Sequence, residues 1–117
     1  EAENVEAIVI DLGYNYCGTT MRVDGLSTMS HLKLLMLEGY DYSSDSEINF
    51  SGTLVNLSNE LGYLGWTHYP FECLPPSFEP DNLVELSLRY SNIKQLWEGT
   101  KVVSTIVIIF SILFSFK

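Results

Sequence analysis

One spacing of apolar residues recurs along this chain and limits what it can fold into. Between residues 83 and 96 it places apolar side chains at Leu83, Leu86, Leu88, Ile93 and Leu96. The L-x-L part alternates as a short strand does, so its leucines point to one side and can enter a core. Asn92, in the polar turn that follows, is suited to satisfy backbone groups where the chain leaves the strand. The run therefore predicts a short buried strand followed by a turn.

The same spacing occurs three more times upstream. The copies are Leu61, Leu64 and Trp66; Leu32, Leu35 and Leu37; and Val5, Ile8 and Ile10. The first residues of the four copies are separated by 27, 29 and 22 residues. These steps are near the period of roughly 20–29 residues that is typical of the leucine-rich repeat. The sequence therefore predicts an α/β solenoid of about four irregular repeats, with short parallel strands on its concave face.

Two connecting segments carry their own signals. Leu26 and Met29 have helical spacing, which predicts a short helix on the outer side of the second repeat. The acidic, serine-rich run from Tyr40 to Glu47 is typical of a surface loop between the second and third repeats. Its tyrosines leave open a role in recognition.

Charge and cysteine content restrict the partners and the compartment. Fifteen acidic against six basic residues give a net charge of −9, which repels phosphate backbones and argues against nucleic acid as a partner. Cys17 and Cys73 form no close-spaced pair, which favours a reducing compartment. An extracellular repeat receptor is an alternative, which is favoured only by the presence of two N-glycosylation sequons, at Asn49 and Asn56.

The residues that could carry chemistry do not form a recognisable site. His68 and Cys73 are close in sequence, but no acidic residue in a known motif would orient the histidine, so a structural cysteine is expected. Two histidines and two cysteines scattered along the chain do not have the short spacings of a zinc site. The sequence also lacks a G-x-x-x-x-G-K-[ST] phosphate loop. We therefore expect no enzyme activity, no catalytic residue, no cofactor and no metal ligand.

Binding to a protein partner has a predicted location. If the strand leucines point inward, the residues between them lie on the concave face. The candidate partner-binding residues are then Met36, Glu38, Tyr63, Thr67, Glu85, Ser87 and Arg89. Their mixture of amphipathic and charged side chains is typical of interfaces, although ordinary surface residues would look the same. Trp66 stands at a leucine position, so we expect it to fill the core.

Several longer runs resemble one family of plant proteins. They are Asn49–Leu54, Leu57–Leu64, Tyr69–Phe78, Leu83–Leu86 and Ser91–Lys101. Over about residues 3–101 the chain is similar to the first repeats of disease-resistance proteins of the Toll/interleukin-receptor, nucleotide-binding, leucine-rich-repeat class. The resemblance implies a truncated recognition or regulatory fragment of an intracellular immune receptor, located in the cytoplasm and acting in defence signal transduction. Implied partners are the nucleotide-binding domain of a receptor, a pathogen effector or a guarded host protein.

The family pattern ends at Lys101, which divides the chain into a repeat region (1–101) and a hydrophobic tail (102–117). The uncharged run Val102–Phe116 is shorter than the roughly 20 residues that span a bilayer as a helix. Its β-branched residues suit a strand, and Ile106 and Ile108 fall where the next repeat strand is due. The alternatives are a small membrane-anchored protein held by this tail, or a tail translated from non-coding sequence.

Overall fold

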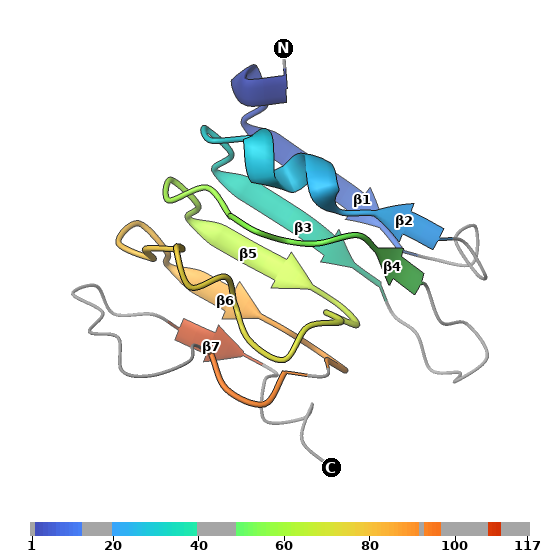
Figure 1. Cartoon of the computed structure of the whole chain (residues 1–117). Coiled ribbons are helices and arrows are strands. Elements are labelled where there is room, and N and C mark those ends of the chain that lie inside the picture. The colour runs from blue at the N-terminus through green and yellow to red at the C-terminus, as the bar shows by residue number, and fades with distance from the viewer. Residues whose placement is uncertain (1, 13–19, 40–48, 92, 97–107, 111–117) are drawn as a thin grey trace.

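A computed structural model describes residues 2–12, 20–39, 49–91, 93–96 and 108–110. Its main feature is one parallel sheet of five short strands. They are β1 (Ala7–Asp11), β3 (Leu34–Glu38), β5 (Tyr63–Trp66), β6 (Glu85–Ser87) and β7 (Ile108–Phe110). The strands lie side by side in chain order, each parallel to the next (Figure 1). This arrangement confirms the predicted solenoid.

The return segments of the repeats form a second layer over one face of this sheet (Figure 1). In it β2 (Thr20–Arg22) and β4 (Asn49–Ser51) pair in parallel as a separate two-stranded sheet. The helical part is small: η1 (Ala2–Asn4) and η3 (Asp24–Thr28) are both 3-10 helices. The predicted outer helix near Leu26 is thus a 3-10 helix, which buries Leu26 and ends before Met29.

The register of the sheet aligns the four sequence copies. Ile8, Leu35, Leu64 and Leu86 stand in one row across the strands. Leu35, Leu64 and Leu86 in this row are fully buried, and so are Leu32, Leu61 and Leu83 at the start of their repeats. Because side chains alternate along a strand, the alignment sends every inward row into the same core. The leucines that recur in the sequence are therefore the residues that form the core.

Aromatic side chains fill the space between the two layers. Trp66 is fully buried and meets Phe50 and Tyr69 edge to face, with ring centroids 5.3 and 5.0 Å apart. The expectation that Trp66 belongs to the core is therefore confirmed. Its indole N–H is buried and has no hydrogen-bond acceptor among the described residues.

A serine side chain satisfies a backbone group at the turn that follows β6. The hydroxyl of Ser91 accepts a hydrogen bond from the backbone N–H of Tyr69 in the preceding repeat, at 3.2 Å. Asn92 lies outside the described residues. The side chain at this turn thus satisfies a neighbouring repeat, because parallel neighbours leave their strands at the same edge of the sheet.

Part of the hydrophobic tail belongs to the sheet. β7 pairs with β6 so that Ile108 is opposite Glu85 and Ile109 is opposite Leu86. The expectation of a final strand is met at Ile108–Phe110. Ile106 and the predicted loop from Tyr40 to Glu47 lie outside the described residues. In the part of the chain that the structure describes, no helix is long and apolar enough to cross a membrane.

Candidate partner-binding surface

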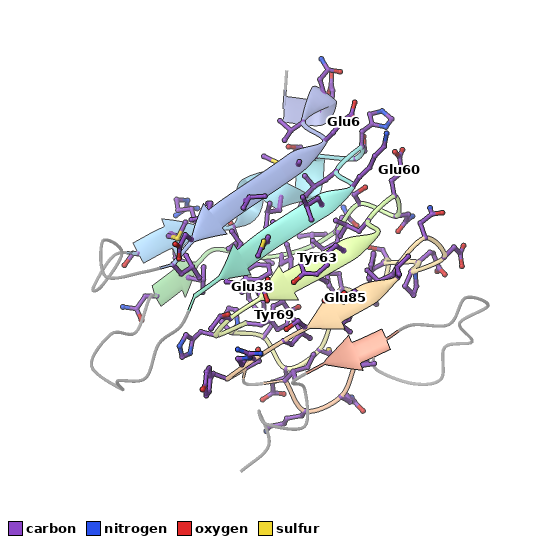
Figure 2. All side chains as sticks on the ribbon, turned by 180° about the vertical axis from the view of Figure 1, so that it is seen from behind. Glu6, Glu38, Glu60, Tyr63, Tyr69 and Glu85 are labelled. Atoms are coloured by element: carbon purple, nitrogen blue, oxygen red, sulfur yellow. The ribbon has the colours of Figure 1, made fainter. Side chains whose placement is uncertain are left out.

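The face of the sheet turned away from the core carries the candidate residues. Rows of side chains cross this face, because every second residue of each strand points to this side. From β1 to β6 the first row is Ala7, Leu34, Tyr63 and Glu85, and the second is Val9, Met36, Gly65 and Ser87. Figure 2 views this side, with Glu38, Tyr63 and Glu85 close together over β3, β5 and β6.

Five of the seven predicted residues are partly exposed on this face: Met36, Glu38, Tyr63, Glu85 and Arg89. The other two are buried, with exposed fractions of 2% for Thr67 and 5% for Ser87. Thr67 has an internal role, since its hydroxyl accepts a hydrogen bond from the backbone N–H of Gly39 at 3.3 Å. The expectation that these two side chains are open to a partner is therefore wrong, because neighbouring strands cover small side chains on a narrow sheet.

A hydrogen bond crosses the middle of the face. The hydroxyl of Tyr63 donates to Oε1 of Glu38 at 2.6 Å. The two residues belong to adjacent strands but not to the same row: Met36 is opposite Gly65, and Tyr63 stands two residues before that glycine. The Tyr63 and Glu38 side chains therefore meet over Gly65.

Gly65 is required for this contact. A Cβ atom at this position would lie 2.6 Å from Cδ of Glu38 and 2.8 Å from Cε1 of Tyr63, closer than real Cβ contacts. The glycine thus leaves the space into which both side chains fold. Because a glycine in a strand weakens the strand, its presence here is explained by this close approach.

The environment of Tyr63 keeps its hydroxyl protonated. Partial burial, the hydrogen bond to Glu38 and the negative charges of Glu38 and Glu85 all raise the pKa of Tyr63 well above its usual range, and Arg89 opposes them. The phenol therefore stays a hydrogen-bond donor to Glu38 at pH values at which a free tyrosine already begins to ionise. This pair gives the centre of the face a defined shape.

The first strand adds surface residues that the sequence analysis did not select. Val9 is 60% exposed on this face, and Asp11 is exposed at the end of the same strand. Asp11 is directly opposite Glu38 in the register. The alternation used for the other strands would have identified both, because Ile8 and Ile10 had already been assigned to the core.

His68 and Cys73, the two residues considered for catalysis, make contacts within the fold. The His68 ring stacks on that of Tyr90 at a centroid distance of 5.7 Å. Cys73 is half-buried, and its carbonyl oxygen accepts a hydrogen bond from the Tyr69 hydroxyl at 2.8 Å. Within the described ranges, no group of three His, Cys, Asp or Glu side chains could hold a metal ion.

Comparison with known proteins agrees with the geometry. The family model described as Leucine Rich Repeat matches residues 82–101. The disease resistance protein RPP2B of Arabidopsis thaliana is 63% identical over 43 residues, which cover 37% of this chain and 4% of that protein. No solved structure matches the chain.

Two further Arabidopsis thaliana relatives cover most of the chain. Disease resistance protein RRS1 is 36% identical over 109 residues, 86% of this chain and 8% of that protein. Disease resistance protein RPP2A is 36% identical over 99 residues, 85% of this chain and 7% of that protein. The chain therefore spans less than a tenth of the length of these relatives. The repeat spacing, the parallel sheet and these matches identify the chain as a leucine-rich-repeat fragment of the plant disease-resistance kind.

Proposed function

We propose that this chain is a recognition or regulatory fragment of a plant immune receptor, without enzyme activity, that acts by binding a protein. The observation that supports this most is a group of partly exposed residues, Met36, Glu38, Tyr63, Glu85 and Arg89, on one face of a continuous parallel sheet. Such a sheet places side chains from several repeats within reach of one partner.

The character of this surface supports protein binding. Tyr63 offers an aromatic ring and is held by its hydrogen bond to Glu38, so little side-chain entropy is lost when a partner covers it. Tyrosine and arginine are enriched at the centres of interfaces. The net charge of −9 favours basic partner surfaces and disfavours nucleic acid.

The proposed partners are the nucleotide-binding domain of a related receptor, a pathogen effector or a host protein that the receptor guards. The proposed location is the cytoplasm. The membrane-anchored alternative has no specific observation in its favour, because Ile108–Phe110 of the tail forms a strand of the sheet. Membrane fractionation of the tagged chain, beside a version that ends at Lys101, tests this part. Resistance to carbonate extraction by the full chain alone would support the anchor instead.

Capture of a receptor domain in plant leaf tissue tests the recognition function. The tagged chain is expressed with the nucleotide-binding domain of a related disease-resistance protein, and recovery of that domain is measured with purified effector present or absent. We expect the pair Tyr63→Ala and Glu85→Lys to reduce recovery at least fivefold.

The matched control is Val55→Glu, because Val55 is 57% exposed and lies outside the five-stranded sheet. Its recovery should equal that of the wild type. Equal recovery by the wild type and the Tyr63/Glu85 variant would contradict recognition through this face.

A further inference from the structure

The face of the sheet that is turned away from the core is divided into two unlike halves. On β5 and β6 the outward residues are mostly polar, and the hydrogen-bonded side chains of Tyr63 and Glu38 cover Gly65. On β1 and β3 the outward residues are apolar, except for the last residue of each strand, which is Asp11 or Glu38. We name the second half the β1–β3 patch, formed by Ala7, Val9, Leu34, Met36, Asp11 and Glu38. We propose that the β1–β3 patch binds a protein segment that carries an apolar side chain next to a lysine or arginine. This inference rests on the proposed function, since it names the chemistry of the partner.

The apolar part of the patch is open to solvent. Ala7 is opposite Leu34, and Val9 is opposite Met36, so four apolar side chains from two strands adjoin. Val9 is 60% exposed, Ala7 is exposed, and the other two are half-buried. Single exposed apolar residues are ordinary on a protein surface, but adjoining ones mark places where a partner removes them from water.

The acidic end of the patch would attract a positively charged side chain. Asp11 and Glu38 are register partners on neighbouring strands, but the Glu38 carboxylate is turned over Gly65 of β5, where it accepts the Tyr63 hydrogen bond. Among the described residues Asp11 has no ion-pair partner, whereas Glu38 already accepts a hydrogen bond from the uncharged Tyr63 hydroxyl. A lysine or arginine of the partner can therefore form an ion pair with Asp11.

The bases of this face are placed elsewhere. Lys33 precedes β3, at the opposite end of the strands from Asp11, and its Nζ lies 3.3 Å from Oε1 of Glu6. Arg89 follows β6, on the far side of β5. Among the described residues neither Lys33 nor Arg89 forms an ion pair with Asp11, so we expect the partner to supply the cation. The chain's six basic residues against fifteen acidic ones disfavour a second copy as that partner.

The spacing of the patch suits a short segment. Val9 and Asp11 are two residues apart on one strand, which separates them by about 6.7 Å along it. Side chains at i and i+4 of a helix are about 6 Å apart, and those at i and i+2 of a strand are about 6.7 Å apart. One apolar side chain can then cover Val9 and Met36 while its basic neighbour reaches Asp11.

Selection from a library of displayed random 12-residue peptides tests the proposal. The full chain is immobilised at low salt, and retained peptides are sequenced and their Kd measured by titration. We expect enrichment of an aliphatic or aromatic residue with Lys or Arg two or four positions away. Val9→Glu and, separately, Asp11→Lys should each weaken binding at least tenfold, whereas Val55→Glu should leave it within twofold.

The outcomes separate this inference from the proposed function. Peptides that lose binding with Tyr63→Ala but not with Val9→Glu or Asp11→Lys would overturn the β1–β3 assignment and leave recognition through the concave face in place. Enriched peptides without basic residues, or no enrichment by a chain with a wild-type circular dichroism spectrum, would also overturn it. Concentration-dependent dimers that dissociate with Val9→Glu would mean that a second copy covers the patch, against the proposal.

Discussion

Trp66 on β5 meets Phe50 on β4 edge to face, at a ring-centroid distance of 5.3 Å, and so ties the five-stranded sheet to the layer behind it. The other inward positions of the same row are Ile10, Leu37 and Leu88. A leucine at position 66 would be too short to reach the aromatic cluster in the same way. The indole therefore adds an aromatic contact between the two layers at the third repeat.

Replacing this indole should strongly destabilise the chain. Trp66→Ala removes a fully buried side chain and leaves a cavity against Phe50 and Tyr69, which should lower the free energy of unfolding by about 3–5 kcal/mol. Urea unfolding followed by circular dichroism measures the loss. Val55→Ala, at an exposed position, should change it by less than about 0.5 kcal/mol. A loss below about 1 kcal/mol for Trp66→Ala would show that the packing of Trp66 against Phe50 and Tyr69 contributes little to the stability of the fold.

Gly65→Ala should break the contact between Tyr63 and Glu38. The added Cβ would displace the ends of both side chains and break their hydrogen bond, so we expect a loss of about 0.5–1.5 kcal/mol in the free energy of unfolding. Shortening Glu38 removes one of the two obstacles. The double variant Gly65→Ala with Glu38→Ala should therefore lose less than the sum of the two single variants, as a double-mutant cycle measures. Strict additivity would show that Gly65 does not serve this contact.

Stability should fall steeply at high pH because of Tyr63. The fold raises the pKa of this phenol, chiefly by burial and by its hydrogen bond to Glu38. The folded state thus holds the proton that the unfolded chain loses near pH 10, and the contribution is full below that pH. It decreases as the pH rises further toward the raised pKa.

Urea unfolding at a series of pH values from 8 to 11.5 measures this effect. Wild type should lose stability more steeply than Tyr63→Phe above pH 10. Burial also raises the pKa of Tyr69, so part of the slope should remain in the variant. Identical slopes for the two proteins would exclude the Tyr63 contribution.

Removing the tail should weaken the last complete repeat. A chain that ends at Lys101 lacks β7, so the edge of β6 loses the strand opposite Glu85, Leu86 and Ser87. Amide hydrogen exchange should then speed up at least tenfold in Glu85–Ser87 and change little in Ala7–Asp11, which lies at the other edge of the sheet. Unchanged exchange in β6 would show that the tail does not stabilise the sheet.

The core was predictable from spacing alone. Leu35, Leu64 and Leu86 recur at a repeat period, and a side-chain alternation of two residues leaves one way to bury them all. The same rule identified Tyr63, Glu85 and Arg89 as outward residues. It would have added Val9 and Asp11 had it been applied to the first strand.

What the sequence by itself determined was the periodic part of this protein: the repeat length, the inward rows, the parallel strands and the position of Trp66 in the core. Only the tertiary structure decided which outward residues are accessible. Thr67 and Ser87 have the same alternation as Tyr63 and Glu85 but are buried, and Tyr63 finds Glu38 only because Gly65 leaves room between them. Periodicity is a property of one strand, whereas exposure and contact depend on the sizes of side chains that neighbouring strands bring alongside, 20 to 30 positions away in the chain.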